Sequence, residues 1–319
     1  MTSRAEPKST GVRTFGHEGM LFASPAELAG VVVPRIRSAE AAGEHVVVAL
    51  ADAHAGLVRA GLGAAAASVR FVDRARWYEA PGRTLAALHR LGVAHADRHV
   101  TVVGEPVLPL DEPLALREWH RLDSVLDAAL ACAPLRVLCV HDARTLPAGV
   151  RREVARTHPV LLAGPTGAVA SRDYRDPVLY SAADAGRRLP APTGRTETLE
   201  IVADLTALRE RVLGAADRAG LTGDRLGDLV VSVNEMAANV LEHGAGKGWI
   251  SLWRIPGHLV CDVFDEGGGL TDPLSGYYPT DVLSVRGYGL WITRQVCDFM
   301  EISGGPDGSL VRLYFRTAG

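Results

Sequence analysis

The chain has 319 residues, a formal net charge of −3 and 47% hydrophobic residues. This length suggests two domains, each large enough to bury a core. The near-neutral charge gives no electrostatic reason to expect binding to nucleic acid or to an acidic membrane surface.

The sequence predicts neither membrane insertion nor secretion. Its longest apolar stretches, such as 46–50 and 64–69, are far shorter than the roughly 20 residues that span a bilayer. The N-terminus is polar and lacks an apolar targeting region. The four cysteines have no paired spacing, which favours buried thiols in a reducing cytoplasm over disulfides or zinc ligands; they are Cys132, Cys139, Cys261 and Cys297. We therefore expect a cytoplasmic protein.

Residues 15–179 alternate short apolar runs with helical stretches. The predicted strands are Val46–Leu50, Val69–Val72, Val100–Val103 and Leu135–Val140. The predicted helices are Pro25–Ala42, Ala53–Leu62, Thr84–Leu91, Leu114–Ala133 and Pro147–Thr157. This alternation predicts a three-layer α/β domain, with a parallel sheet covered by helices on both faces. The pattern does not decide whether Leu114–Ala133 packs within this domain or against a partner.

This domain carries four short motifs: His17-Glu18, the segment 104–109 (GEPVLP), Cys139–Asp142 and Thr157–Pro159. Together they resemble the MEDS sensory domain. The resemblance implies a sensing role and a small-molecule ligand, which it does not identify. No phosphate-binding P-loop follows the first predicted strand, so we expect no nucleotide in this domain.

The histidines of the first domain have two interpretations. Together, His17, His120, His141 and His158 could form a ligand or metal site. Scattered histidines are more often surface residues or hydrogen-bonded core residues, and the sequence alone favours this second interpretation.

A connector rich in alanine, proline, glycine and arginine is expected at residues 180–196. The second domain, 197–319, is predicted to begin with a strand at Leu199–Ala203 and a helix at Leu205–Ala219. Asp224 is expected to cap the helix that follows.

That next helix carries a row of polar residues. Glu235, Asn239 and His243 are spaced four apart, so all three share one helix face. Apolar residues at helical spacing occupy the opposite side; they are Leu226, Leu229, Val230, Val233, Ala237 and Val240. A carboxylate and an amide oxygen one turn apart suit Mg²⁺, which keeps several waters and binds phosphates.

Two glycine motifs follow in a fixed order. The predicted strand Leu259–Phe264 ends in Asp265, with Gly267 and Gly269 after it. The segment 286–290 (RGYGL) then opens a predicted helix, which extends towards Met300. A further predicted strand, Ser309–Phe315, ends the pattern. Glycines allow a ligand to approach the backbone closely, and a helix N-terminus attracts anions.

Residues 196–319 resemble the GHKL ATPases of the Bergerat α/β-sandwich fold, most closely the bacterial anti-sigma-factor serine kinases. The resemblance implies that Glu235 is a general base, that Asn239 holds Mg²⁺, and that Asp265 binds the adenine amino group of ATP. Residues 272–285 would form the ATP lid. The remaining residues implied in ATP binding are His243, Gly267, Gly269, Arg286, Gly287, Gly289, Leu290 and Ser309. Ser309 stands where the family often has threonine.

The resemblance implies a serine/threonine protein kinase that phosphorylates a STAS-type antagonist and controls a sigma factor under input from the sensory domain. It also implies a homodimer. One alternative is an ATP-bound module that sequesters a partner without turnover. Another is a sensor histidine kinase-like ATPase, although no histidine lies between His158 and His243 and no room remains for a phosphoaccepting hairpin. An ATPase like gyrase or the heat-shock chaperones is a third alternative, but no transducer domain is evident.

Overall fold

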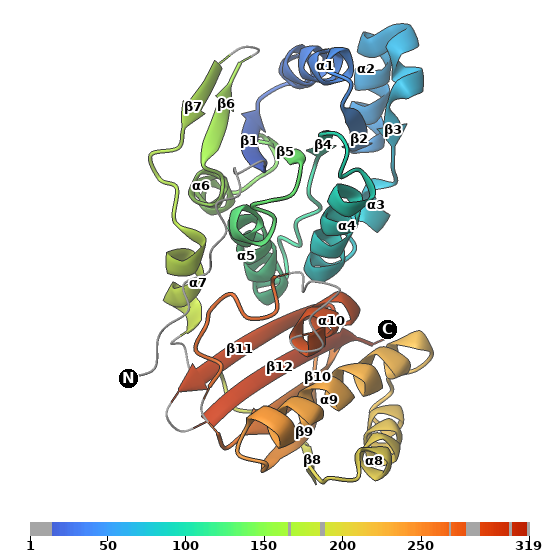
Figure 1. Cartoon of the computed structure of the whole chain (residues 1–319), viewed down its shortest axis with the longest axis vertical. Helices are drawn as coiled ribbons and strands as arrows, with labels where there is room; N and C mark the ends of the chain where they lie inside the picture. Colours follow the sequence, from blue (N-terminus) through green and yellow to red (C-terminus); the bar gives the residue numbers. More distant parts are fainter. Residues whose placement is uncertain are drawn as a thin grey trace.

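The computed structural model describes residues 15–164, 167–185, 189–267, 269–278, 288–305 and 308–317. Two sheets organise these residues, each with its own helices (Figure 1). We call the seven-stranded sheet and its helices the N-terminal domain, and the five-stranded sheet and its helices the C-terminal domain. This arrangement agrees with the predicted mixed α/β fold class.

The N-terminal domain has the strand order β3-β2-β4-β5-β1-β6-β7. Its strands are β1 (Gly16–Phe22), β2 (His45–Ala49), β3 (Arg70–Phe71), β4 (Val100–Gly104), β5 (Leu135–Asp142), β6 (Val160–Ala163) and β7 (Gly167–Ala170). Its helices are α1 (Pro25–Ala41), α2 (Asp52–Leu62), α3 (Arg74–Trp77), α4 (Pro81–Ala94), α5 (Pro113–Ala129), α6 (Ala148–Thr157) and α7 (Pro177–Ala185), with a 3-10 helix at Gly63–Ser68.

Alternating residues of the central strands bury the two faces of this sheet. Val46 and Val48 of β2 lie in a core with α1 and α2, whereas Val47 and Ala49 lie in a core with α4 and α5. A strand buried on both sides needs apolar residues throughout, which explains the continuous runs in the sequence. The predicted parallel sheet with helices on both faces is therefore confirmed.

The structure corrects several of the predicted elements. The central strand β1 was missed, and β7 pairs antiparallel to β6 at the sheet edge. Helix α7 extends to Ala185 with Ser181 buried, so the predicted connector begins too early. Asp224 does not cap the next helix: Gly223, with a φ of 60°, precedes that helix, and Asp224 is its first residue. The helix predicted to extend towards Met300 ends at Val296.

The C-terminal domain has an antiparallel sheet with the order β11-β12-β10-β9-β8. Its strands are β8 (Glu197–Glu200), β9 (Gly248–Ile255), β10 (His258–Asp265), β11 (Phe299–Gly305) and β12 (Gly308–Arg316), and its helices are α8 (Leu205–Arg218), α9 (Asp224–His243) and α10 (Tyr288–Val296). Leu259, Cys261 and Val263 of β10 face a core shared with α8 and α9. Helices thus cover one face of this sheet.

The other face of this sheet lies against the N-terminal domain. Val260 and Tyr314 pack there with Ala115 of α5. On the same face, Arg312 forms a two-pronged ion pair with Asp262 across the paired strands, with N–O distances of 2.6 and 2.7 Å. Both side chains are buried. This pairing explains the carboxylate of Asp262 within the otherwise apolar run 259–264 of β10, because a buried charge needs a partner.

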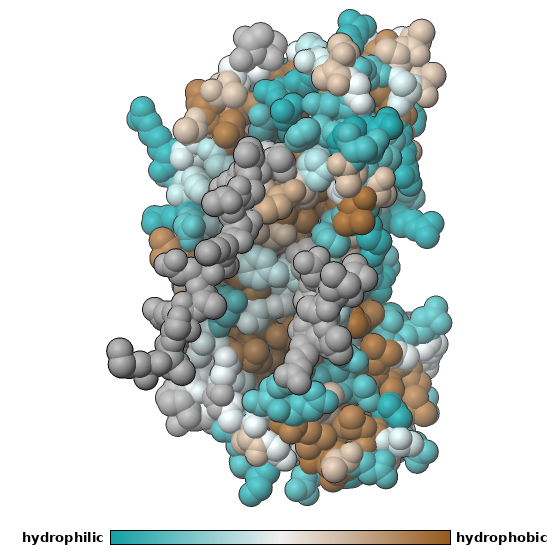
Figure 2. All heavy atoms as spheres, in the orientation of Figure 1, coloured by the Kyte–Doolittle hydropathy of each residue, from teal (hydrophilic) through white to brown (hydrophobic). Residues whose placement is uncertain are grey.

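Figure 1 shows α4 and α5 between the two sheets. Figure 2 shows the surface of the molecule from the same side. Hydrophobic side chains gather over the lower part, which is the C-terminal domain, whereas the upper part is mostly hydrophilic. Exposed hydrophobic residues of the C-terminal domain include Leu213 of α8 and Val231 of α9.

Among the described helices, none is both long and apolar enough to cross a membrane.

Candidate nucleotide-binding site

Helix α9 presents its polar row as predicted. Glu235 and Asn239 are half-buried and His243 is exposed, whereas Leu229, Val233 and Ala237 are buried on the opposite side. The apolar side packs against the sheet, which fixes the direction of the polar row. The helix therefore orients a carboxylate and an amide towards the same space.

Asp265 stands at the end of β10, where the strand opens into a glycine-rich segment. Its Oδ1 atom accepts hydrogen bonds from the backbone N–H groups of Gly267, at 2.9 Å, and Ala245, at 3.1 Å. Within the described residues, its Oδ2 atom has no hydrogen-bond partner. Two donors thus hold one oxygen in place and leave the second able to accept from a ligand.

Ser309 faces Asp265 from the neighbouring strand. The two residues are paired in register between β10 and β12. Ser309 is buried, and its Oγ atom accepts a hydrogen bond from the N–H of Leu270 at 3.2 Å. The hydroxyl therefore holds the chain just after the glycine motif, a role that a threonine hydroxyl could also perform.

Gly289 brings the start of α10 against the polar row of α9. A Cβ atom added at Gly289 would lie 3.1 Å from Nδ2 of Asn239 and 3.3 Å from Oε2 of Glu235. The absence of a side chain therefore permits this close approach. The N-terminal end of a helix is a favourable place for an anion such as phosphate, and here it lies beside an amide that can bind a cation.

These residues surround one cavity of about 290 Å³, which we call the nucleotide cavity. It is lined by Met236, Asn239, Val240, His243, Gly244, Val263, Asp265, Gly269, Leu270, Gly289, Leu290, Ser309 and Val311. Its size is near the lower end of the roughly 300–1,000 Å³ that small-molecule sites occupy. Polar groups lie among apolar walls, as is usual in small-molecule sites.

The cavity collects most of the residues predicted from the sequence, and two of them lie beside it. Glu235 does not line the cavity but reaches the start of α10. Gly267 supports Asp265 through its N–H group. Arg286 and Gly287 lie outside the residues that the structure describes.

The sequence interpretation included Leu290 and noted that Gly244 fits the motif of the polar row, but it did not identify the other apolar walls of the cavity. Val263 and Val311 each lie two residues from a predicted polar site on the same strand, and the two-residue period of strands could have revealed both. Met236 and Val240 similarly lie beside the polar row of α9.

A substitution at Gly244 can test whether the Asp265 carboxylate contacts the nucleotide. The glycine's φ of −90° is open to alanine, but a Cβ atom there would lie 2.6 Å from Oδ1 of Asp265 and would overlap Oδ2. We expect Gly244→Ala to displace the carboxylate and to weaken ATP binding about 10- to 100-fold, the value of one charge-assisted hydrogen bond. Calorimetric titration with Mg²⁺-ATP measures this.

Gly227→Ala is the matched control, because this exposed residue of the same helix has no neighbouring atom within 4 Å of an added Cβ. Its affinity should equal that of the wild type. Equal affinity of Gly244→Ala and the wild type would show that Asp265 does not contact the nucleotide.

The N-terminal domain contacts the segment that follows the glycine motif. Leu274 and Tyr277 are buried in the core that contains α4 and α5. The guanidinium of Arg294 lies over the Tyr277 ring, 3.6 Å from its centre, and 3.9 Å from the carboxylate of Glu118. Burial raises the pKa of Tyr277 to about 12, so its hydroxyl remains protonated. The described part of the predicted ATP lid is thus held against α5.

Helix α4 also contacts α10 directly. An added Cβ at Gly82 would overlap the backbone carbonyl oxygen of Arg294, and Arg83 donates a hydrogen bond to the carbonyl of Gln295 at 3.0 Å. The helix that begins beside the nucleotide cavity therefore ends against the N-terminal domain.

Two family models match the chain. The model of the methanogen/methylotroph, DcmR sensory domain (MEDS) matches residues 16–159. The model of the histidine kinase-like ATPase domain matches residues 201–315. No curated protein matches the chain significantly.

Similar solved structures include the RsbU and RsbW domains of Rv1364c from Mycobacterium tuberculosis, at 17% identity and a TM-score of 0.30, covering 41% of this chain and 34% of that one. The Acinetobacter baumannii histidine kinase AdeS is 18% identical at a TM-score of 0.25, covering 44% of this chain and 76% of that one. The chain thus spans about a third of the length of the first of these proteins. The two family matches fall on the two sheets described above: the chain joins an N-terminal MEDS domain to a C-terminal histidine kinase-like ATPase domain.

Proposed function

We propose that the C-terminal domain binds Mg²⁺-ATP and transfers its terminal phosphoryl group to a serine or threonine hydroxyl of a protein partner. One observation carries this proposal: a single cavity gathers Asn239, Asp265, Gly289 and Ser309 from four different elements. The side chain of Glu235, on α9, lies against the start of α10 beside this cavity. A structural core would not need this combination of a carboxylate, an amide and backbone without side chains.

The two ends of the cavity suit the two ends of ATP. Asp265 has one carboxylate oxygen held by backbone N–H groups and the other available to accept from the adenine amine. Val263, Leu270 and Val311 supply apolar walls for the base. The helix start at Gly289 and the amide of Asn239 lie together at the other end, where phosphates would bind.

The residues present fit a magnesium ion. Mg²⁺ is commonly held by one or two protein oxygens, with phosphate oxygens and waters completing its shell. The Asn239 carboxamide supplies one such oxygen, and the ion would neutralise charge on the phosphates. Glu235 lies one helical turn away, in the position to accept the proton of an attacking hydroxyl.

A hydroxyl acceptor is favoured over a histidine of the same chain. A histidine kinase-like transfer needs a phosphoaccepting histidine on a helical hairpin next to the ATPase domain. No histidine lies between His158 and His243. Between α7 and β8, the described residues 189–196 form no helix or strand. The phosphoryl group is therefore expected to go to another protein.

The partners we propose come from the resemblance to anti-sigma-factor kinases: a STAS-type antagonist as substrate and a sigma factor as the protein controlled, with a homodimer as the working form. A small-molecule ligand on the N-terminal domain would supply the signal. The contacts of α4 and α5 with α10 and with Tyr277 support control through the lid and the phosphate end of the cavity.

The test is transfer from ATP labelled in its terminal phosphate to a candidate STAS-type partner. We expect label on the partner that survives acid treatment, because phosphoserine and phosphothreonine are acid-stable. Acid-labile label on this chain would instead indicate histidine phosphorylation. Binding of ATP with no transfer to any cognate partner would favour the sequestering alternative.

A further inference from the structure

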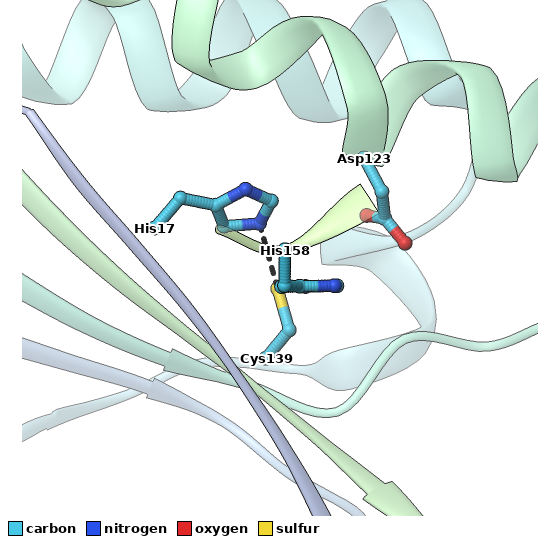
Figure 3. Close-up of side chains that lie close together, drawn as sticks. All are labelled: His17, Asp123, Cys139 and His158. Atoms are coloured by element: carbon cyan, nitrogen blue, oxygen red, sulfur yellow. Dashed lines mark hydrogen bonds between the residues drawn. The ribbon is translucent and has the colours of Figure 1, made fainter. Parts of the chain in front are cut away.

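Four buried side chains of the N-terminal domain converge on one point, outside the nucleotide cavity. We call them the His–Cys–Asp cluster: His17 of β1, Asp123 of α5, Cys139 of β5 and His158, directly after α6. One ligand-type atom from each residue lies within 4.8 Å of those of the other three. Figure 3 shows the four side chains close together, with Asp123 reaching down from the helix above His17, Cys139 and His158.

The cluster is closed to solvent. The exposed fractions are 2% for His17, 5% for Asp123, 3% for Cys139 and 0% for His158. His158 lies so close to β1 that a Cβ added at Gly19 would be 2.8 Å from its ring. A glycine on the central strand therefore makes room for the imidazole.

Neighbouring groups fix the orientation of both imidazoles. The Nδ1 atom of His17 lies 3.2 Å from a carboxylate oxygen of Asp127, so Nδ1–H donates and Nε2 carries the lone pair. The Nδ1 atom of His158 lies 2.8 Å from the carbonyl oxygen of Val154, which assigns the proton to Nδ1 in the same way. A carboxylate or carbonyl behind an imidazole is the usual support for a metal-binding histidine.

The Nε2 atoms of both imidazoles remain for the inside of the cluster. His17 Nε2 accepts a hydrogen bond from the Cys139 thiol, with an N–S distance of 3.7 Å, and His158 Nε2 is buried without a hydrogen-bond partner. Around a tetrahedral zinc ion, a nitrogen and a sulfur ligand are separated by about 3.6 Å, given metal–ligand distances of about 2.05 and 2.3 Å. The His17–Cys139 pair already has this spacing.

We propose that His17, Asp123, Cys139 and His158 form a binding site for a divalent transition-metal ion of the zinc class. Imidazole and thiolate ligands select such ions over Mg²⁺ and Ca²⁺, which prefer oxygen. Closing the widest separation to that of a tetrahedral site requires side-chain shifts of about 1 Å. Cys139, a buried free cysteine, would supply the thiolate ligand of this site.

A bound metal ion would supply partners for the buried polar groups of the cluster. The Asp123 carboxyl group and the Cys139 thiol are both buried, and the Nε2 atom of His158 is buried without a hydrogen-bond partner. Polar groups are costly to bury without a partner. A divalent ion would bind the carboxylate, the thiolate and the Nε2 atoms of both imidazoles.

Helix α5 links the His–Cys–Asp cluster to the contact between the two domains. Asp123 and its neighbour Asp127 lie on α5, and the same helix carries Glu118, which contacts Tyr277 and Arg294. A bound ion would tie α5 to β1 and β5. Metal occupancy would therefore set how firmly α5 holds the described part of the lid.

Cobalt(II) is the probe for this site, because thiolate coordination gives a charge-transfer band that oxygen and nitrogen ligands do not. The full-length protein would be stripped with a chelator and titrated with Co²⁺ alone, in a Cys132→Ser background that removes the exposed thiol. We expect one equivalent to bind with a thiolate band and visible bands of tetrahedral cobalt. Zn²⁺ should displace it and raise the melting temperature.

Cys139→Ser should lose the thiolate band, and His158→Gln should weaken Co²⁺ binding at least about tenfold. Cys297→Ser, which changes a buried thiol of the other domain, should behave like the background protein. The proposal is wrong if the folded background protein gives no thiolate band and no zinc-dependent rise in melting temperature. It is equally wrong if the band persists in Cys139→Ser. If Cys139→Ser does not fold, the His158→Gln titration decides.

Discussion

Replacing Glu235 with glutamine is expected to lower phosphoryl transfer by about 10²- to 10⁴-fold while leaving Mg²⁺-ATP affinity nearly unchanged. The carboxylate faces the start of α10 but does not line the nucleotide cavity, so its loss removes a proton acceptor rather than a binding contact. Glutamine keeps the shape and cannot accept the proton. Transfer to the partner and calorimetric binding, measured on the same preparation, separate the two effects.

Glu242→Gln is the control for this experiment, because Glu242 lies on the same helix with an exposed side chain. It should retain both activities. Full transfer by Glu235→Gln would remove Glu235 as the general base. A parallel loss of ATP binding would place the residue in nucleotide recognition instead.

Gly82→Ala is expected to destabilise the protein by about 3 kcal/mol or more and to loosen the contact between α4 and α10. The added Cβ would overlap the carbonyl oxygen of Arg294 and lie 3.1 Å from the backbone nitrogen of Gln295. Backbone cannot rotate away as a side chain can, so the two helices must move apart. A thermal melt, together with faster amide hydrogen exchange along α10, would record the change.

Gly30→Ala makes the same substitution in α1, where the glycine is exposed and nothing lies within 4 Å of an added Cβ. It should stabilise the protein by up to about 1 kcal/mol through helix propensity. If Gly82→Ala behaved like Gly30→Ala, the N-terminal domain would not press on α10, and control of the lid through this contact would be untenable.

Local periodicity was enough to place the polar row on one helix face, whereas the roles of the cavity's polar residues came from the resemblance to the GHKL ATPases. Glu235 and Asn239 share a face because α9 is a regular amphipathic helix whose apolar side is fixed by the core. Asp265 could be placed because an apolar strand ends there before glycines. Such features depend on neighbours within one turn or one strand, which the sequence displays directly.

The contacts between distant segments could not be predicted in this way. Arg83 meets Gln295 across 212 residues, and the partner of Asp262 lies 50 residues away on another strand. No local pattern encodes the register of β10 against β12, so the sequence does not reveal the partner of Asp262.

The His–Cys–Asp cluster shows the same limit. His17 and Cys139 are 122 residues apart and meet because β1 lies beside β5 in the sheet. Strand β1 escaped prediction because its sequence, GHEGMLF, begins with two glycines and two polar residues. With that strand missing, the histidines remained scattered positions without a common location.

Titrating Mg²⁺-ATP into the full-length wild type, Asp265→Asn and Glu266→Gln tests the central claim most directly. Asparagine would turn an N–H donor either towards the adenine amine or towards the backbone N–H groups of Ala245 and Gly267, so we expect an affinity loss of about 100-fold. Glu266 is the exposed neighbouring carboxylate, and its variant should bind like the wild type. Equal affinity of Asp265→Asn and the wild type would contradict the placement of adenine in this cavity.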